Sequence, residues 1–260
     1  MHTLGYLLVS AGLALAVFSG YMLWGSNVVG DRASAQILQL ALETLEQSPA
    51  AAPAPRDALS QTPSVLLDPS IPEVDTDTRP AASLTAASRA PAAGAAVQAP
   101  ATQAAPLEQG DLIGIVTIPS IDVEVPVLEG MGASVLDQGV LGHYPGTAAP
   151  GQVGNFAVAG HRTTHGAPMY DIDRIAVGDP ITVETSRGWD VYTMQRHRIV
   201  TPDAVEVIAP VPDDPGATPS AAWMVLTSCH PKLSAAQRII AYAVLDRHVP
   251  RSSGPPVELG

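Results

Sequence analysis

Short apolar runs bounded by proline and glycine fill the second half of this chain. They occupy residues 112–118, 123–128, 156–160, 180–184, 191–194, 204–208, 223–227 and 238–245. Runs of this length between turn residues are typical of β-strands. About eight short strands with few helical patterns predict a mainly β domain, closed or nearly closed into a barrel, rather than alternating strands and helices. Ser134–Asp137 and Met169–Ile172 are the two places where the pattern allows a helical turn.

The amino-terminal segment has a different pattern, because no residue from Leu4 to Trp24 carries a charge. A helix of roughly 21 residues is about 31 Å long, which matches a hydrocarbon core of about 30 Å. The apolar length, with Tyr21 and Trp24 at its end, favours a retained anchor over a cleaved signal peptide. We therefore expect a single transmembrane helix within residues 1–30.

Residues 31–106 connect this anchor to the β-rich part. Ser34–Leu45 has apolar residues at helical spacing, which predicts a short amphipathic helix beside the membrane. From Pro49 to Pro106, Ala, Pro, Ser and Thr dominate, and such a composition cannot bury enough apolar surface to offset chain entropy. The sequence thus predicts an anchor (1–30), a juxtamembrane segment with a disordered linker (31–106), and one globular domain (107–260).

Charge and location narrow the class of function. The 260 residues carry a formal net charge of -12, which argues against nucleic acid as a partner. A long domain after a membrane span can translocate whatever the charge beside the span. We expect the β-rich domain on the outer side of the cell membrane.

Cys229 is the only cysteine of the chain, so it has no disulfide partner within it. It follows the apolar run 223–227 and precedes a loop that opens at Pro231. A buried cysteine acting as a small hydrophobe is one interpretation. The polar neighbours and the exported setting favour the other, which is a nucleophile at a strand end.

A cysteine nucleophile needs an imidazole partner, and His161 has the matching position. It ends the apolar run 156–160, as Cys229 ends its own run, and strand ends on neighbouring strands can meet. His230 is adjacent to Cys229 and is expected to point to the opposite face, while His143 and His165 lie in loops that could fold over the site. Arg238 begins the last apolar run, where its guanidinium could return beside Cys229 and stabilise an oxyanion.

The motifs at these positions resemble those of a known family. Phe156-Ala157-Val158-Ala159-Gly160-His161-Arg162, Leu226-Thr227-Ser228-Cys229 and Arg238 are similar to the His, Cys and Arg motifs of sortases, the membrane-anchored transpeptidases of Gram-positive bacteria. Cys229-His230-Pro231-Lys232 and Gly142-His143-Tyr144-Pro145-Gly146-Thr147 resemble class E sortases of actinobacteria. Two positions depart from the pattern: Ser228 stands where Thr or another small residue usually precedes the cysteine, and His165 stands where class E members often carry Tyr.

The resemblance implies a closed eight-stranded sortase barrel. No cofactor or metal site is predicted, because no arrangement of acidic residues resembles a calcium site. It implies that Cys229 attacks the Thr-Gly bond of an LAXTG or LPXTG sorting signal on a surface protein, that His161 protonates the leaving amine, and that Arg238 supports the oxyanion. An amine of a lipid II-type peptidoglycan precursor would then resolve the thioacyl enzyme. Tyr144, Thr227 and Ser228 are the substrate-binding candidates.

Two alternatives remain at this point. An L,D-transpeptidase also uses an exported cysteine and a histidine, but its motif has Gly directly before the cysteine, where this chain has Ser228. A membrane-anchored β-domain that only binds cell-wall components would leave Cys229 unreactive. A thiol-reactivity measurement separates this second alternative from an enzyme.

Overall fold

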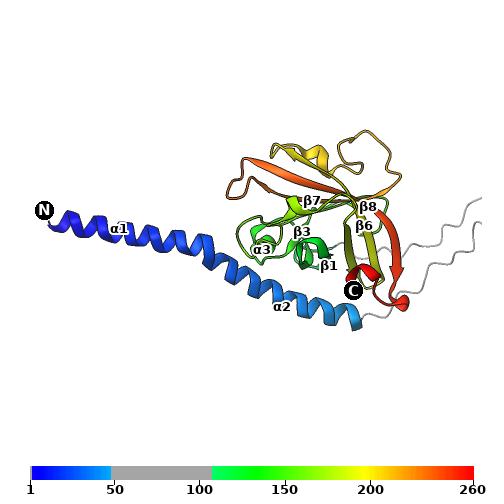
Figure 1. The fold of residues 1–260 in the computed structure, drawn as a ribbon, viewed down its shortest axis with the longest axis horizontal. Helices are drawn as coiled ribbons and strands as arrows, with labels where there is room; N and C mark the ends of the chain where they lie inside the picture. Colours follow the sequence, from blue (N-terminus) through cyan, green and yellow to red (C-terminus); the bar gives the residue numbers. More distant parts are fainter. Residues whose placement is uncertain (1, 48–106) are drawn as a thin grey trace, which may run out of the picture. The chain divides into compact units, whose positions relative to one another are not determined.

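The structure, a computed structural model, describes residues 2–47 and 107–260 (Figure 1). The amino-terminal part contains α1 (His2–Gly20), a π-helical turn (Tyr21–Gly25) and α2 (Ser26–Gln47). The strands are β1 (Leu112–Ile118), β2 (Val123–Glu129), β3 (Leu141–His143), β4 (Gly154–Ala159), β5 (Pro180–Thr185), β6 (Gly188–Val200), β7 (Ala222–His230) and β8 (Gln237–Pro250). The shorter helices are α3 (Ala133–Leu136) and 3-10 turns at Pro119–Ile121, Ile172–Arg174, Val205–Ile208, Arg251–Ser253 and Val257–Leu259.

The eight strands close into a barrel in the order β1-β2-β3-β4-β7-β8-β6-β5. Two neighbouring pairs, β2 with β3 and β4 with β7, are parallel, and the other pairs are antiparallel. The closed eight-stranded barrel confirms the predicted architecture. The crossover that makes β4 and β7 parallel matters for function, because their carboxyl ends then lie at the same rim.

The barrel interior is filled by alternate residues of its strands. Phe156 and Val158 of β4 and Met224 and Leu226 of β7 are fully buried in one cluster with inward residues of the other strands. Alternation places every second side chain on the same face of a strand. Burying a side chain such as Phe156 contributes about 1.5–3 kcal/mol, so the core fixes both strands that lead to the predicted site.

One predicted strand is wrong and one strand was not predicted. Residues 204–208 form a 3-10 turn, Val205–Ile208, instead of a strand. The Asn155 side chain donates to the carbonyl oxygens of Val207 (3.1 Å) and Ala209 (2.9 Å), so a side chain rather than a neighbouring strand satisfies this backbone. The strand that was not predicted is β3, whose three residues pair with both β2 and β4.

Both helical turns expected in the domain are present, but each is shifted along the chain. α3 begins and ends one residue before the predicted Ser134–Asp137 turn, and the 3-10 turn Ile172–Arg174 overlaps the predicted Met169–Ile172 turn only at Ile172. Asp137 is the carboxyl-terminal cap residue of α3. These turns therefore flank the chain segment that carries His161.

α2 contains the amphipathic segment predicted at Ser34–Leu45 and extends beyond it at both ends. Leu38, Ala41 and Leu45 lie one helical turn apart and pack against Ile115 of β1. The helix therefore uses one apolar face to lie on the barrel wall.

Membrane anchoring by residues 1–30 stays a prediction. Of the helices in residues 2–47 and 107–260, none has both the length and the hydropathy that crossing a bilayer requires. The predicted linker at 49–106 lies outside the described residues.

Candidate active site

Cys229 and Arg238 face each other across two hydrogen-bonded strands. Cys229 of β7 pairs directly with Arg238 of β8 in an antiparallel register. Directly opposed residues project from the same face of a sheet, with Cβ atoms about 4.5–5.5 Å apart. The predicted return of the chain from Pro231 to a strand beside Cys229 is thus confirmed. The Arg238 guanidinium donates to the carbonyl oxygens of Ala235 (3.0 Å) and Gln237 (2.9 Å), which holds it at the rim.

His161 leaves the neighbouring strand at the same level as Cys229. The parallel pairing of β4 with β7 ends at Ala159 and Thr227, so His161 and Cys229 each lie two residues beyond the last pair. The Gly160 N–H continues the ladder to the Thr227 carbonyl (3.2 Å). The two strand ends therefore carry the imidazole and the thiol to a common rim, as the sequence suggested.

A hydrogen bond from Ser228 connects these two strand ends. The buried hydroxyl of Ser228 donates to the Gly160 carbonyl oxygen at 2.8 Å. A Cβ on Gly160 would lie 2.6 Å from a Leu141 methyl carbon, so only glycine allows this approach. The residue before the cysteine and the residue before the histidine are thereby joined directly.

The His161 ring has an acidic partner that sequence reasoning missed. Its Nε2 lies 2.9 Å from Oδ1 of Asp137, and both side chains are partly exposed, 28% and 44%. The His165 ring lies beside the His161 ring, with centroids 4.8 Å apart. The position of Asp137 at the end of the predicted helical turn was the only available signal, and it does not by itself indicate a contact with a residue 24 positions away.

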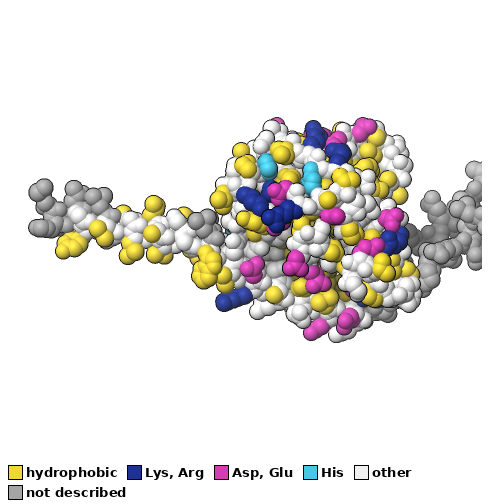
Figure 2. Space-filling view, in the orientation of Figure 1, with side chains coloured by type: hydrophobic (Ala, Val, Ile, Leu, Met, Phe, Trp, Pro, Cys, Tyr) yellow, Lys and Arg dark blue, Asp and Glu magenta, His cyan; other side chains and the backbone are white. Residues whose placement is uncertain are grey.

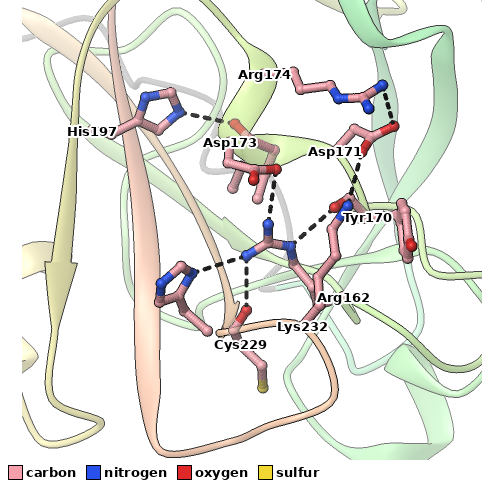
Figure 3. A network of polar contacts seen from close by, with 10 residues as sticks. Arg162, Tyr170, Asp171, Asp173, Arg174, His197, Cys229 and Lys232 are labelled. Atoms are coloured by element: carbon pink, nitrogen blue, oxygen red, sulfur yellow. Dashed lines mark hydrogen bonds and ion pairs between the residues drawn. The ribbon is translucent and has the colours of Figure 1, made fainter.

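Arg162 is a second residue whose importance emerges only in the fold. It is 3% exposed and lies behind the Cys229 backbone (Figure 3). Its guanidinium donates to the carbonyl oxygens of Tyr170 (3.0 Å) and Cys229 (3.3 Å) and pairs with Asp173 (2.8 Å). Arg162 therefore connects the segment after His161 to the strand end that carries the thiol.

The Arg162 guanidinium also contacts His230, and its charge lowers the pKa of Asp173. His230 Nδ1 lies 3.3 Å from Arg162, away from the Cys229 sulfur, which Figure 3 shows pointing out of this network. Desolvation opposes ionisation of Asp173, but the Arg162 charge and the hydrogen bonds around that carboxylate outweigh it and hold its pKa below the usual range. The network thus stays charged at neutral pH.

The loop after His161 is held from outside the barrel by α2. Asn27 donates to the Thr163 carbonyl (3.3 Å) and accepts from the Gly166 N–H (3.1 Å). A Cβ on Gly30 would lie 2.6 Å from the His165 carbonyl oxygen, so helix and loop meet backbone to backbone. His165 itself has a positive φ of 52°. The helix α2 therefore helps to determine the position of the segment that follows His161.

A small pocket lies next to Arg238. Tyr144, Thr227 and Arg238 line it together with the apolar side chains of Val205, Ile208 and Ile240. The Tyr144 hydroxyl lies 3.0 Å from the Thr227 hydroxyl. Thr227 and Cys229 occupy alternate positions of β7 and therefore the same face, so this pocket adjoins the thiol side of the rim.

His143 does not lie in a loop over the site, contrary to expectation. It belongs to β3, is 4% exposed, and its Nδ1 lies 2.6 Å from a carboxylate oxygen of Glu129. Its Nε2 is 2.8 Å from the Thr147 hydroxyl. These contacts make His143 part of the support beneath the Tyr144 loop.

On the face shown in Figure 2, basic and acidic side chains lie intermingled, and histidines reach the surface among them. This face, on a chain with an acidic net charge, does not provide the basic stripe that nucleic acid needs.

Comparison with known proteins identifies this architecture. Residues 116–246 match the Sortase domain family. The chain belongs to the sortase family. Sortases are cysteine transpeptidases, and neither the L,D-transpeptidase nor the purely binding alternative is favoured by this match.

Similar sortases include class E members from actinobacteria. Sortase SrtE1 of Streptomyces coelicolor is 40% identical over 57% of this chain and 44% of its own length, so the alignment spans less than half of that relative. The crystal structure of sortase E1 from the same organism, with a tripeptide in its active site, has a TM-score of 0.54 at 39% identity and covers 58% of this sortase and 97% of that chain. The SrtA sortase from Actinomyces oris has a TM-score of 0.55 at 38% identity, over 60% and 94% of the two chains.

Proposed function

We propose that this sortase is a class E-type cysteine transpeptidase, with Cys229 as nucleophile, His161 as acid and base, and Arg238 as oxyanion stabiliser. The observation that carries the proposal is the direct pairing of Cys229 with Arg238, at the strand end adjacent to the one that carries His161. A thiolate, an imidazolium and a fixed guanidinium at one rim are the groups that acyl transfer requires.

In the first half-reaction the Cys229 thiolate attacks the carbonyl carbon of the Thr-Gly bond. The Arg238 guanidinium, held by two backbone carbonyls, stabilises the negative charge on the tetrahedral oxygen. The C–N bond then breaks, and the His161 imidazolium gives its proton to the leaving glycine amine. The product is a thioester between Cys229 and the threonine carbonyl.

In the second half-reaction an amine of a peptidoglycan precursor, of lipid II type, attacks the thioester. His161 takes the proton from this amine, and the Cys229 thiolate leaves. The new amide bond links the surface protein to the cell-wall precursor, and both catalytic groups return to their starting protonation states.

The sorting signal is proposed to be of the LAXTG or LPXTG type. The pocket beside Arg238 supports this, because its apolar walls suit the apolar residues at the start of such a signal. Tyr144 and Thr227 line that pocket and are the proposed substrate contacts. For Ser228, the hydrogen bond to Gly160 favours a role in holding the rim together.

We place the enzyme at the cell membrane of a Gram-positive bacterium, with the barrel on the cell-wall side. The support is the uncharged stretch Leu4–Trp24 and the exposed apolar side chains along α1, among them Leu13, Val17 and Phe18 (Figure 2). Fractionating cells that express the full chain tests this. Recovery in the soluble fraction would refute the anchor.

The direct test of the function is a cleavage and capture experiment. The full chain, purified in detergent, is incubated with an LAXTG peptide and a triglycine acceptor. We expect cleavage between Thr and Gly, a thioacyl adduct on Cys229 in the intact mass spectrum, and a ligated product.

Cys229→Ala is the matched control and is expected to lose cleavage and adduct by about 10⁴-fold or more while keeping its melting temperature. A folded wild-type chain that forms no adduct and cleaves neither LAXTG nor LPXTG peptides would overturn the proposal.

A further inference from the structure

Three metal-binding side chains gather at the outer side of His161. One ring nitrogen of His161, one ring nitrogen of His165 and a carboxylate oxygen of Asp137 all lie within 4.8 Å of one another. They come from the end of α3 and from the loop after β4, so the fold brings together two segments that are far apart in sequence. Two imidazoles and one carboxylate form a donor set that Zn²⁺ uses when one coordination position stays open.

The two distances from the Asp137 oxygen to the histidine nitrogens fit a tetrahedral ion. Bonds of about 2.0–2.1 Å to a tetrahedral Zn²⁺ put the ligand atoms roughly 3.3–3.4 Å apart. The Asp137 oxygen lies 2.9 Å from His161 Nε2 and 3.6 Å from His165 Nδ1, which brackets this value. Small rotations of partly exposed side chains would complete the geometry without moving the backbone.

A second observation is the unsatisfied nitrogen of His165. Its Nδ1 is buried and has no hydrogen-bond partner, although the Asp137 carboxylate is the nearby acceptor. The His165 side chain as a whole is 26% exposed, and its Nδ1 faces the Asp137 carboxylate at 3.6 Å, so a cation between the two atoms would satisfy this nitrogen. The loop that holds His165 is itself fixed by Asn27 of α2.

We propose that Asp137, His161 and His165 form a reversible Zn²⁺ site that switches the enzyme off. The ion would be coordinated by the lone pair of His161 Nε2, so this nitrogen could no longer accept or donate a proton. A water molecule would take the open fourth position. This effect rests on the proposed role of His161 as acid and base, whereas binding of the ion does not. This is a metal site that the sequence analysis did not predict.

Direct Zn²⁺ binding tests the site independently of activity. The full chain carrying Cys229→Ser, without an affinity tag, is purified in detergent, stripped with a chelator and titrated with Zn²⁺ against a chromophoric competitor. We expect one bound equivalent, and at least a tenfold weaker affinity when His165→Asn is added. Asparagine suits the positive φ of this position, so the loop should keep its conformation.

His248→Asn is the matched control, because His248 also pairs with an aspartate, Asp190 at 2.7 Å, but has no third donor in the described part of the chain. It should leave the Zn²⁺ affinity unchanged. No bound equivalent, an affinity that His165→Asn does not alter, or an equal loss in His248→Asn would mean an adventitious ion only and would overturn the proposal.

The switch is tested in the chain that retains Cys229. Zn²⁺ should inhibit peptide cleavage, and His165→Asn should need at least a tenfold higher Zn²⁺ concentration for the same inhibition. Zn²⁺ binding without any cleavage activity would refute the proposed function and leave the site standing. Cleavage with equal inhibition of both proteins would refute the switch and leave the function standing.

Discussion

The two sides of the candidate active site are held by different kinds of structure. Cys229 and Arg238 sit opposite each other in a strand ladder, and backbone hydrogen bonds on both sides fix their spacing. His161 lies one residue beyond a strand-end glycine, in a segment held by side chains, by tight glycine contacts and by α2. The strand ladder fixes the positions of Cys229 and Arg238, whereas the position of His161 depends on a few individual contacts, each of which a single substitution can remove.

This difference has a consequence for control of the enzyme. A ladder changes position only when strands separate, which costs many hydrogen bonds at once. The loop after His161 can shift when a single contact with α2 or Asp137 changes. Variation in activity is therefore expected to come from the imidazole side of the rim.

The largest effect is expected on the ladder side. Arg238→Ala removes the proposed oxyanion donor and should lower kcat/KM by about 10²-fold or more, with the melting temperature nearly unchanged because the residue lies at the rim. Peptide cleavage followed by mass spectrometry measures this. Arg174→Ala, which removes a mostly exposed arginine outside the rim, is the control and should remain active. An Arg238→Ala enzyme within twofold of wild type would remove this residue from the mechanism.

The connection between the two sides should respond to a change at Arg162. Arg162→Ala removes four polar contacts of a buried guanidinium, with Tyr170, Cys229, Asp173 and His230, and should lower the free energy of unfolding by about 2–3 kcal/mol. Denaturant titration measures this loss, and Arg162→Lys, which keeps the charge but not the planar fork, should recover part of it.

The effect of Arg162→Ala should also depend on pH. The pKa of Asp173 is lowered in the folded state, so its stabilising contribution is full above the unfolded-state pKa and is lost as the pH falls through the folded-state value. The stability difference between wild type and Arg162→Ala should therefore narrow below about pH 4, since the ordinary pKa of an Asp carboxyl group is 3.8. A difference that stays constant from pH 7 to pH 3 would show that the ion pair adds nothing to the hydrogen bonds.

A smaller effect is expected where α2 meets the loop. Gly30→Leu forces the helix and the His165 backbone apart and should lower turnover about tenfold, or roughly 1.4 kcal/mol, while labelling of Cys229 by a small alkylating reagent stays within twofold. Gly20→Leu is the control, because a side chain there meets nothing within 4 Å. If Gly30→Leu and Gly20→Leu are equally active, α2 plays no part in positioning His161.

The smallest effect is expected at the substrate pocket. Tyr144→Phe removes one hydroxyl contact with Thr227 and keeps the ring, so it should cost about 0.5–1.5 kcal/mol, mainly as a higher KM. Steady-state kinetics with LAXTG and LPXTG peptides would also reveal whether the change alters preference between the two signals. An unchanged KM for both peptides would show that the Tyr144 hydroxyl does not contribute to substrate binding.

Much of the fold could be predicted because most strands can be recognised from their own residues. The runs at 112–118, 123–128 and 180–184 match observed strands within about one residue, since an apolar run and its flanking turn residues are properties of the segment itself. The short strand β3 could not be predicted in this way. Its three residues become a strand only because β2 and β4 pair with them on both sides.

At 204–208 the error is the reverse one: a strand was predicted, and the segment forms a 3-10 turn. The apolar residues of this segment do bury one side chain, Val207, but it belongs to a cluster with Ala157, Val225 and Tyr242 and not to the main core cluster of the barrel. A buried asparagine 52 positions away satisfies the backbone of this segment, and no local pattern contains that information. Asp137 and Arg162 were missed for the same reason, because their partners are distant in sequence.

Sequence alone determined the chemical groups of this protein and the strand ends that carry them. A lone cysteine after one apolar run, a histidine after another and an arginine at the start of a third are features of the chain itself. The tertiary structure decided how these groups are held, through the parallel β4–β7 crossover, the Ser228 hydroxyl, the Asp137 carboxylate and the Arg162 network. The reason is physical: periodicity and turn residues act between neighbours in the chain, whereas the geometry of a reaction depends on contacts that only folding creates.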